Sequence, residues 1–170
     1  MPSDDSRIPA ALAGRVRVRV CALIFDDAGE SILLVEHAGL WSAEPFWTPP
    51  GGGVEFSESV GEALAREVRE ETGLDVAMGA VRYVLDFVRP PLHAVSLYAE
   101  ARLVSGRLAD ARLGSDPEFE PDAQILRSLR WVGLDDLAGL ALTPAPFSEC
   151  LARDARAGFP DGTVYLGTFR

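Results

Sequence analysis

The segment from residue 52 to residue 74 constrains the fold of this 170-residue chain more than any other. It reads GGVEFSESVGEALAREVREETGL and carries start and stop signals for a single helix. Ser59 followed three residues later by Glu62 is a capping box, in which each side chain accepts a hydrogen bond from the other residue's backbone. Gly73 suits the left-handed position at which helices end. The segment therefore predicts a helix that begins at about Val60 and ends just before Gly73.

The predicted helix has an acidic face beside an apolar one. Its apolar stripe, at about 100° per residue, consists of Val60, Leu64 and Val68. Glu67, Glu70 and Glu71 occupy positions i, i+3 and i+4, and Glu71 falls at the edge of the stripe. Arg66 can pair with Glu70 one turn away, but one arginine cannot neutralise three carboxylates. Clustered carboxylate oxygens are the ligands that Mg²⁺ and Mn²⁺ prefer, so we expect a divalent metal here; a solvated acidic helix face is the alternative.

The loop before this helix is suited to hold its backbone close to a ligand. Residues 48–53 read Thr-Pro-Pro-Gly-Gly-Gly, a stiff approach followed by three glycines. Because glycine has no Cβ atom, its backbone can approach a metal ion or a phosphate closely. A glycine cluster alone indicates no more than a turn. Its place directly before the acidic helix makes it a candidate part of a site.

The whole segment resembles the signature of the Nudix hydrolases, which cut a diphosphate linked to some other moiety X. That signature is G-x5-E-x7-R-E-U-x-E-E-x-G-U, where U is a bulky apolar residue. The matching positions are Gly52, Glu58, Arg66, Glu67, Val68, Glu70, Glu71, Gly73 and Leu74. The family often has Leu-Pro-Gly-Gly where this chain has Pro-Pro-Gly-Gly at residues 49–52, a small departure. Residues 130–137 also resemble the end of a Nudix domain.

The resemblance implies a fold of the α/β (α+β) class, an α/β/α sandwich with a mixed β-sheet. It also implies a metal-dependent pyrophosphohydrolase that uses Mg²⁺ or Mn²⁺. The expected metal ligands are Glu67, Glu70, Glu71 and the carbonyl of Gly51, and the expected catalytic residues are Glu70, Glu67, Arg66 and Glu58. In this assignment Arg66 orients a glutamate and Glu58 supports a metal-bound water.

The general base stays open between several acids. Family members often use a further acid from a loop before the last strand, where the candidates are Glu118, Glu120 and Asp122. Gln124 stands close to the position at which a carboxylate is expected.

Substrate preference rests on fewer residues. Members that prefer ADP-ribose often carry a proline sixteen residues beyond the signature, where Pro90 stands, although it can equally be a strand terminator. The expected substrate is therefore ADP-ribose or a related nucleotide sugar. The alternatives are a (d)NTP or dinucleoside polyphosphate pyrophosphohydrolase and a non-enzymatic nucleotide-sensing domain. The substrate-binding candidates are Arg17, Arg19, Trp47, Pro90 and Glu120; a solvated sheet face for the arginines and a core position for the tryptophan are the alternatives.

Net charge narrows the class of partner. At −10, the chain is poorly suited to bind nucleic-acid polymers or anionic membranes, so we expect a small nucleotide-type substrate. No apolar run approaches the ~20 residues of a membrane span, and a cytoplasmic protein is expected. We expect a flexible arm over residues 1–14, the Nudix domain over 15–157 and a tail over 158–170. The tail is a candidate extra strand or homodimer contact, and the first strand is a second candidate contact.

The remaining elements follow from hydrophobic periodicity and turn residues. Residues 15–25 and 31–37 are expected to form one hairpin around a turn at 26–29. Further expected elements are strands over 75–88, 94–104 and 129–132, a long loop over 105–123, a helical turn over 135–140 and a helix over 146–157.

Overall fold

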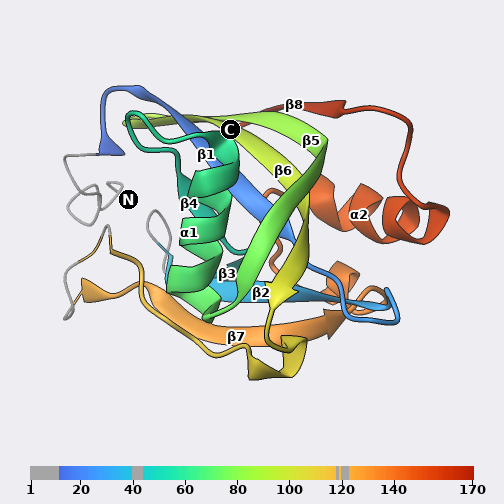
Figure 1. Ribbon diagram of the computed structural model, residues 1–170. Helices are drawn as coiled ribbons and strands as arrows, with labels where there is room; N and C mark the ends of the chain where they lie inside the picture. The colour runs from blue at the N-terminus through green and yellow to red at the C-terminus, as the bar shows by residue number, and fades with distance from the viewer. Residues whose placement is uncertain (1–11, 40–43, 118, 120–122) are drawn as a thin grey trace.

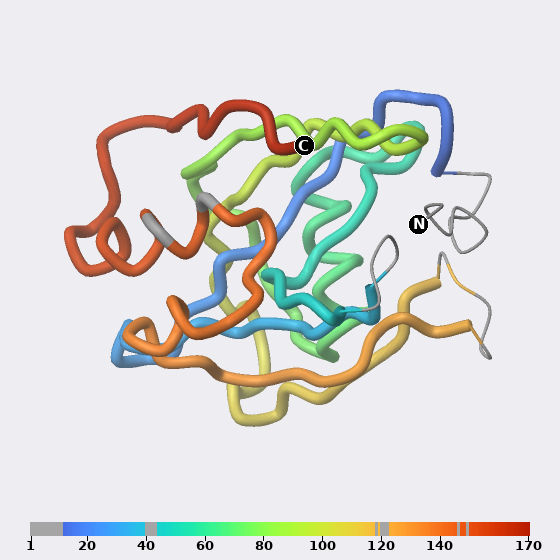
Figure 2. The backbone as a smooth tube through the Cα atoms, turned by 180° about the vertical axis from the view of Figure 1, so that it is seen from behind, coloured from blue at the N-terminus to red at the C-terminus, as the bar shows by residue number. Residues whose placement is uncertain are grey.

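The computed structural model describes residues 12–39, 44–117, 119 and 123–170. Two β-sheets lie at the centre, and helices α1 (Val60–Thr72) and α2 (Pro146–Ala157) lie on opposite sides of the larger one (Figures 1 and 2). Each helix packs over its own hydrophobic cluster. Neighbouring residues of the first strand belong to different clusters, because side chains alternate along a strand: Val20 faces α1, and Cys21 faces α2. The expected α/β/α sandwich is confirmed.

The larger sheet has five strands in the order β4-β1-β6-β5-β8. Their bounds are β1 (Val16–Leu23), β4 (Gly51–Gly53), β5 (Asp75–Arg89), β6 (Leu92–Ser105) and β8 (Val164–Phe169). Strand β1 pairs in parallel with β6, and β5 pairs in parallel with β8, whereas β1 with β4 and β5 with β6 are antiparallel. The sheet is therefore mixed, as expected.

The smaller sheet has three strands in the order β3-β2-β7. Its strands are β2 (Ser31–His37), β3 (Phe46–Thr48) and β7 (Leu126–Gly133), all paired antiparallel. The β2–β7 register shifts between Glu36 and His37, because Arg127 of β7 is left unpaired as a bulge opposite the end of β2. Strand β7 begins three residues earlier than expected, because Leu126 pairs with His37 beyond that bulge.

Helix α1 confirms the prediction made from its end signals. Both hydrogen bonds of the capping box form between Ser59 and Glu62, and Gly73 ends the helix with φ of 70°. The side chains of Leu64 and Val68 are fully buried. Since α1 packs against β4 and β5, its acidic edge is held next to the glycine strand.

The expected hairpin of residues 15–25 and 31–37 forms only at its tip. Asp26 Oδ1 accepts hydrogen bonds from the backbone N–H groups of Glu30 and Ser31, and pairing stops soon after the Phe25–Ile32 bridge. Beyond that point β1 joins the larger sheet and β2 the smaller one. The hairpin prediction was wrong in this respect, because pairing with distant strands outweighs pairing between neighbours in sequence.

The remaining segments have the predicted type of secondary structure. Helix α2 has the predicted bounds, and Phe147 and Leu151 on its inner side are fully buried. Short 3-10 helices occur at η3 (Leu108–Asp110), within the predicted loop, and at η5 (Leu137–Gly139), within the predicted helical turn. No helix of the described residues is both long and apolar enough to cross a membrane.

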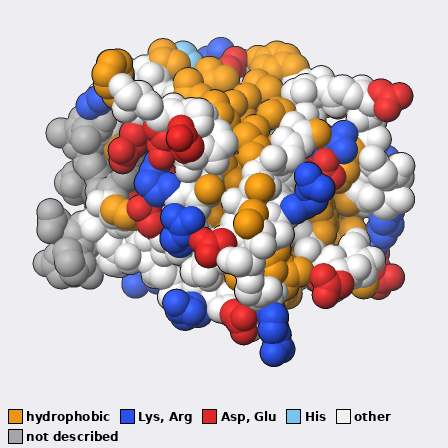
Figure 3. Space-filling model, viewed as in Figure 1, with side chains coloured by type: hydrophobic (Ala, Val, Ile, Leu, Met, Phe, Trp, Pro, Cys, Tyr) orange, Lys and Arg blue, Asp and Glu red, His pale blue; other side chains and the backbone are white. Residues whose placement is uncertain are grey.

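Apolar side chains gather on the face of the larger sheet beside α1 (Figure 3). Val16 and Val18 lie on the same face of β1 as Val20, which packs under α1, and they are 59% and 44% exposed. At the far edge, β8 pairs with β5 and leaves Tyr165 60% exposed. Dimerisation through the first strand or the tail stays a prediction.

Candidate active site

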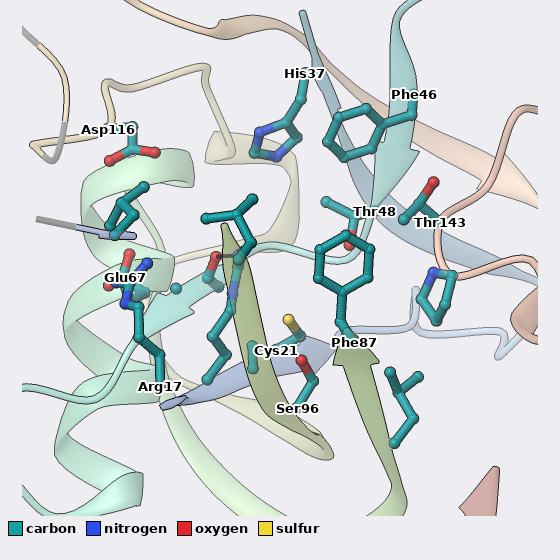
Figure 4. A pocket seen from close by; sticks show the side chains of 18 of the residues that line it. Arg17, Cys21, His37, Phe46, Thr48, Glu67, Phe87, Ser96, Asp116 and Thr143 are labelled. Atoms are coloured by element: carbon teal, nitrogen blue, oxygen red, sulfur yellow. Dashed lines mark hydrogen bonds between the residues drawn. The ribbon is translucent and has the colours of Figure 1, made fainter. Parts of the chain in front are cut away.

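A pocket lies between the two sheets, next to the N-terminal half of β1 (Figure 4). Strands β1, β4, β5 and β6 of the larger sheet form one wall, and β2 and β3 of the smaller sheet contribute to the other. The loop before β7 adds Asp116 and Phe119. Figure 4 shows two different ends: Arg17, Glu67 and Asp116 lie at one, and aromatic side chains lie at the other.

The glycine strand β4 brings the backbone against the carboxylates of α1. The N–H of Gly51 donates to Oε2 of the buried Glu71 at 2.9 Å. A Cβ atom on Gly52 would collide with the carboxylate of Glu67. A side chain at residue 52 would therefore occupy the space in which this carboxylate lies.

Arg66 clamps the acidic face of α1 in place. Its Nε and Nη2 donate to the two carboxylate oxygens of Glu58, each at 2.9 Å, and Nη2 also donates to the carbonyl of Gly53 at 3.0 Å. Its Nη1 donates to Glu67 at 2.9 Å and to Glu70 at 3.2 Å. The structure thus brings together all four residues that the sequence singled out as catalytic.

The two buried carboxylates have too little positive charge around them. Burial raises the pKa of Glu67 to about 7, although hydrogen bonding to Arg66 opposes the shift. Burial also raises the pKa of Glu71 well above its ordinary value, and the nearby Glu67 and Asp116 add to the shift. A buried carboxylate pair of this kind is stabilised by a cation close to both groups.

The donor set fits a hard divalent cation, but the side chains are not arranged around one. The buried oxygens of Glu67 and Glu71 and the carbonyl of Gly51 are of the type that Mg²⁺ and Mn²⁺ prefer. Within the part of the chain that the structure describes, no three acidic, histidine or cysteine side chains converge on one metal position. The reason is that Arg66 holds Glu67 and Glu70, and the Gly51 N–H holds Glu71.

Two of the predicted substrate-binding residues line the pocket. Arg17 and Arg19 point to the pocket side of β1, and Nη2 of Arg19 donates to the Gly51 carbonyl at 3.3 Å. Both arginines are half-buried, whereas Val16 and Val18, on the other face of the strand, are exposed. The arginine face of β1 is thus the pocket face, which places two cations near the carboxylates.

Trp47 and Pro90 lie outside the pocket. Because side chains alternate along β3, Phe46 and Thr48 line the pocket, whereas Trp47 is buried under the guanidinium of Arg130, 5.3 Å from its ring centre. Pro90 is exposed in the turn between β5 and β6. Glu120 and the alternative acids Glu118 and Asp122 lie outside the described residues.

The loop before β7 contributes an acid that the spacing did not single out. Asp116 lines the pocket, in the same loop as the predicted acids. Gln124, at the position where a carboxylate was expected, accepts from the backbone N–H of Asp116 at 2.8 Å. Its amide also donates to the carbonyls of Asp116 and Phe119. Gln124 therefore shapes the loop that presents Asp116, and only the folded loop reveals this.

The other end of the pocket is aromatic and was not predicted at all. His37, Phe46, Thr48, Phe87 and Thr143 gather there (Figure 4). The rings of His37 and Phe46 are stacked, with centroids 5.2 Å apart and planes 10° apart. These residues come from separate strands and loops, so no sequence spacing marks them as a group.

Residues 15–153 of this chain match the model of the NUDIX domain. Among curated proteins, the m7GpppN-mRNA hydrolase NUDT17 of Danio rerio is 27% identical over 138 residues, which are 76% of this chain but 46% of that protein. The CTP pyrophosphohydrolase of Escherichia coli is 29% identical over 130 residues, which are 75% of this chain and 84% of that protein. This chain thus spans less than half the length of the zebrafish relative.

Among solved structures, the MutT protein from Methanosarcina mazei has a TM-score of 0.65 and 27% sequence identity. The likeness covers 84% of this chain and 95% of that one. The fold and the signature segment thus agree with the same family. The names of the two curated relatives point to different substrates, m7GpppN-mRNA and CTP.

Proposed function

This chain belongs to the Nudix hydrolase family, since the NUDIX domain covers residues 15–153, and we propose that it hydrolyses the diphosphate of a nucleoside diphosphate linked to a moiety X. The observation that carries the proposal is the pair of buried carboxylates, Glu67 and Glu71, beside the glycine strand and two arginines of one pocket. Buried charges of one sign that lack compensation are typical of sites that bind a cation.

Nudix hydrolases generally use divalent metal ions. In this chain Glu67, Glu70, Glu71 and the Gly51 carbonyl would hold Mg²⁺ or Mn²⁺. When bound, such an ion polarises a phosphoryl oxygen and favours ionisation of a water molecule. Arg66 keeps Glu58 and Glu67 in position, and it would have to release Glu70 for that carboxylate to turn toward a ligand.

The side chains of the site would have separate roles in hydrolysis. Arg17 and Arg19 bind phosphate oxygens, because they are the basic side chains that line the described pocket. Glu70 receives the proton of the attacking water, because it is more exposed than Glu67 and a single 3.2 Å contact to Arg66 holds it. The bond between phosphorus and the bridging oxygen then breaks, and the two phosphate products separate.

ADP-ribose or a related nucleotide sugar is our first choice of substrate, and a (d)NTP or dinucleoside polyphosphate is the second. The likeness to the CTP pyrophosphohydrolase of Escherichia coli supports the second class. Pro90, the residue that favours ADP-ribose by resemblance, lies outside the pocket. The sensor alternative has less support, because every acidic position of the signature is intact.

Turnover with Mg²⁺ or Mn²⁺ tests the proposal against ADP-ribose, NADH, dinucleoside polyphosphates and (d)NTPs. We expect one class to be hydrolysed and Glu70→Gln to lower kcat by about 10²–10⁴-fold, the usual contribution of a general base. Glu30→Gln, an exposed glutamate in the β1–β2 turn, is the matched control and should keep wild-type turnover. No turnover across the panel, with Mn²⁺ shown to bind by calorimetry, would contradict the proposal.

A further inference from the structure

His37 carries a buried nitrogen that has no hydrogen-bond partner. The residue is 5% exposed, and its Nε2 is without a partner among the described residues. An unsatisfied buried polar atom costs free energy, so native proteins rarely keep one without a reason. Figure 4 shows the ring at the aromatic end of the pocket, on the side away from Glu67.

His37 is the last residue of β2, and its side chain lines this pocket. It pairs with Leu126 of β7, just past the unpaired Arg127 of that strand. The stacking of His37 on Phe46 then fixes the plane of the imidazole. The unsatisfied nitrogen of a ring that is held in place and lines the pocket thus points to a ligand contact.

The surroundings of His37 select the chemistry of that ligand. Phe46, Phe87 and Pro144 supply flat apolar surface, whereas Arg17, Glu67 and Asp116 lie at the other end of the pocket. Burial lowers the pKa of His37 to about 3, and Arg19 adds to the shift, so the imidazole is neutral at neutral pH. A neutral donor or acceptor among rings suits a planar heteroaromatic group better than a phosphate or a sugar.

We infer that the aromatic end of the pocket binds a nucleobase and that Nε2 of His37 forms a hydrogen bond with the edge of that base. His37 is then a specificity-determining residue for the nucleoside part of the substrate. The placement of the diphosphate at the Glu67 end rests on the proposed function. The hydrogen bond between the base and the imidazole rests only on the unsatisfied Nε2 and the aromatic residues around it.

Two matched ligands separate the two ends of the pocket. The first is an α,β-methylene ribonucleoside diphosphate, whose bridging carbon resists hydrolysis; each of the four common bases is tried, and the tightest binder is used. The second is methylenediphosphonate, the same anion without the nucleoside. Both are titrated by calorimetry into the full chain with Mg²⁺. We expect wild type to bind the nucleoside analogue at least about tenfold more tightly, the usual effect of one well-placed polar contact.

Substitutions then assign this difference to His37. His37→Leu should weaken the nucleoside analogue about tenfold, leave methylenediphosphonate within about twofold and raise Tm, because it removes an unsatisfied buried nitrogen. His37→Gln, which keeps a polar group, should lose less affinity, and Phe46→Leu should weaken the nucleoside analogue alone. Phe56→Leu, at a fully exposed ring, is the control and should change neither affinity.

A spectroscopic measurement on the wild type tests the same contact without relying on the folding of a variant. The chain has two histidines, so ¹⁵N-histidine labelling gives two imidazoles, and His93→Gln assigns them. The Nε2 resonance of His37 in the wild type should shift with the nucleoside analogue and stay unchanged with methylenediphosphonate.

Three outcomes would overturn the inference. The first is equal affinity of the wild type for the two ligands, and the second is an equal loss of affinity for both ligands in His37→Leu. The third is an Nε2 resonance of His37 that does not shift when the nucleoside analogue binds. Because no turnover is needed, the inference is judged separately from the proposed function. Nucleobase binding that depends on His37, in a chain without hydrolytic activity, would support the inference and contradict the proposed function.

Discussion

Helices α1 and α2 both bury carboxylates, but the surroundings shift the pKa values of these carboxylates in opposite directions. On α2, Asp154 accepts hydrogen bonds from Tyr83 Oη and Arg153 Nε, each at 2.8 Å. Burial alone would raise the pKa of Asp154, but these bonds outweigh it, and the pKa is lowered. On α1, the pKa values of Glu67 and Glu71 are raised, because burial outweighs the bonds that they receive.

The difference separates an acid whose charge the fold stabilises from the pair that we propose to bind a metal. Asp154 has its partners inside the fold, so the charged form is stable without any ligand. Glu67 and Glu71 are held by Arg66 and by one backbone N–H, which leaves the charged pair in need of a further cation. A buried acid therefore indicates a binding site only when its own fold fails to satisfy it.

The largest expected effect follows from removing the unsatisfied charge. Glu71→Gln should lower metal-dependent turnover by roughly 10³-fold, because a lost metal ligand removes several kcal/mol of transition-state stabilisation. In EDTA its Tm should equal or exceed that of wild type, since a desolvated charge is gone. Steady-state kinetics and calorimetric unfolding check both. A clearly lower Tm of the variant in EDTA would show that Glu71 stabilises the fold, as Asp154 does, and would contradict the difference between the two helices.

The glycine beside Glu67 should give the next effect. Gly52→Ala puts a methyl group where the Glu67 carboxylate lies, so we expect metal affinity to fall about 10–100-fold with little change in far-UV circular dichroism. Mn²⁺ binding followed by electron paramagnetic resonance measures it. Gly139→Ala, with open space around the added methyl group, is the matched control. Equal affinities of the two variants would show that the carboxylate is not held against β4 for metal binding.

The reverse pattern is expected on α2. Asp154→Asn should cost about 1.5–3 kcal/mol of unfolding free energy, the usual value for hydrogen bonds to a charged group, and leave kcat of the folded protein unchanged. Urea unfolding and turnover at saturating substrate check this expectation. A loss of kcat with intact stability would instead make Asp154 part of the site.

The smallest expected effect is a pH dependence of that same stability difference. The pKa of Asp154 is lower in the folded state than the unfolded value of about 3.9. Its contribution is therefore present above about pH 4 and is lost as the pH falls through the lower folded value. The stability gap between wild type and Asp154→Asn should shrink below pH 4 in urea titrations. A gap that grows on acidification would reverse the sign of the shift.

Sequence reasoning succeeded where the determining contacts are local. The bounds of α1 follow from the side chains of Ser59 and Glu62 and the backbone freedom of Gly73, all within one segment. The Arg66 contact to Glu70 follows from helical spacing in the same way. These features need no knowledge of the rest of the chain.

Prediction from the sequence failed where pairing between distant strands decides which residues become neighbours. The expected β1–β2 hairpin opens because β1 finds β4 and β6, while β2 finds β3 and β7. His37 reaches the pocket from the end of β2, and Asp116 reaches it from a loop shaped by Gln124. Neither contact leaves a spacing in the sequence, because each is set by which strands become neighbours. The pocket was thus predictable at the α1 end and unpredictable at the aromatic end.

The opening of that hairpin has an evolutionary consequence. Since β1 and β2 share only a turn, the two walls of the pocket belong to separate hydrogen-bonded sheets. Mutations that reshape the wall around His37 and Phe46 leave the strand pairing behind Glu67 intact. With the nucleobase bound there, as we infer, a lineage can change the base that it recognises while its phosphate chemistry stays constant. The division between the sheets makes substrate range and catalytic machinery separately inheritable traits.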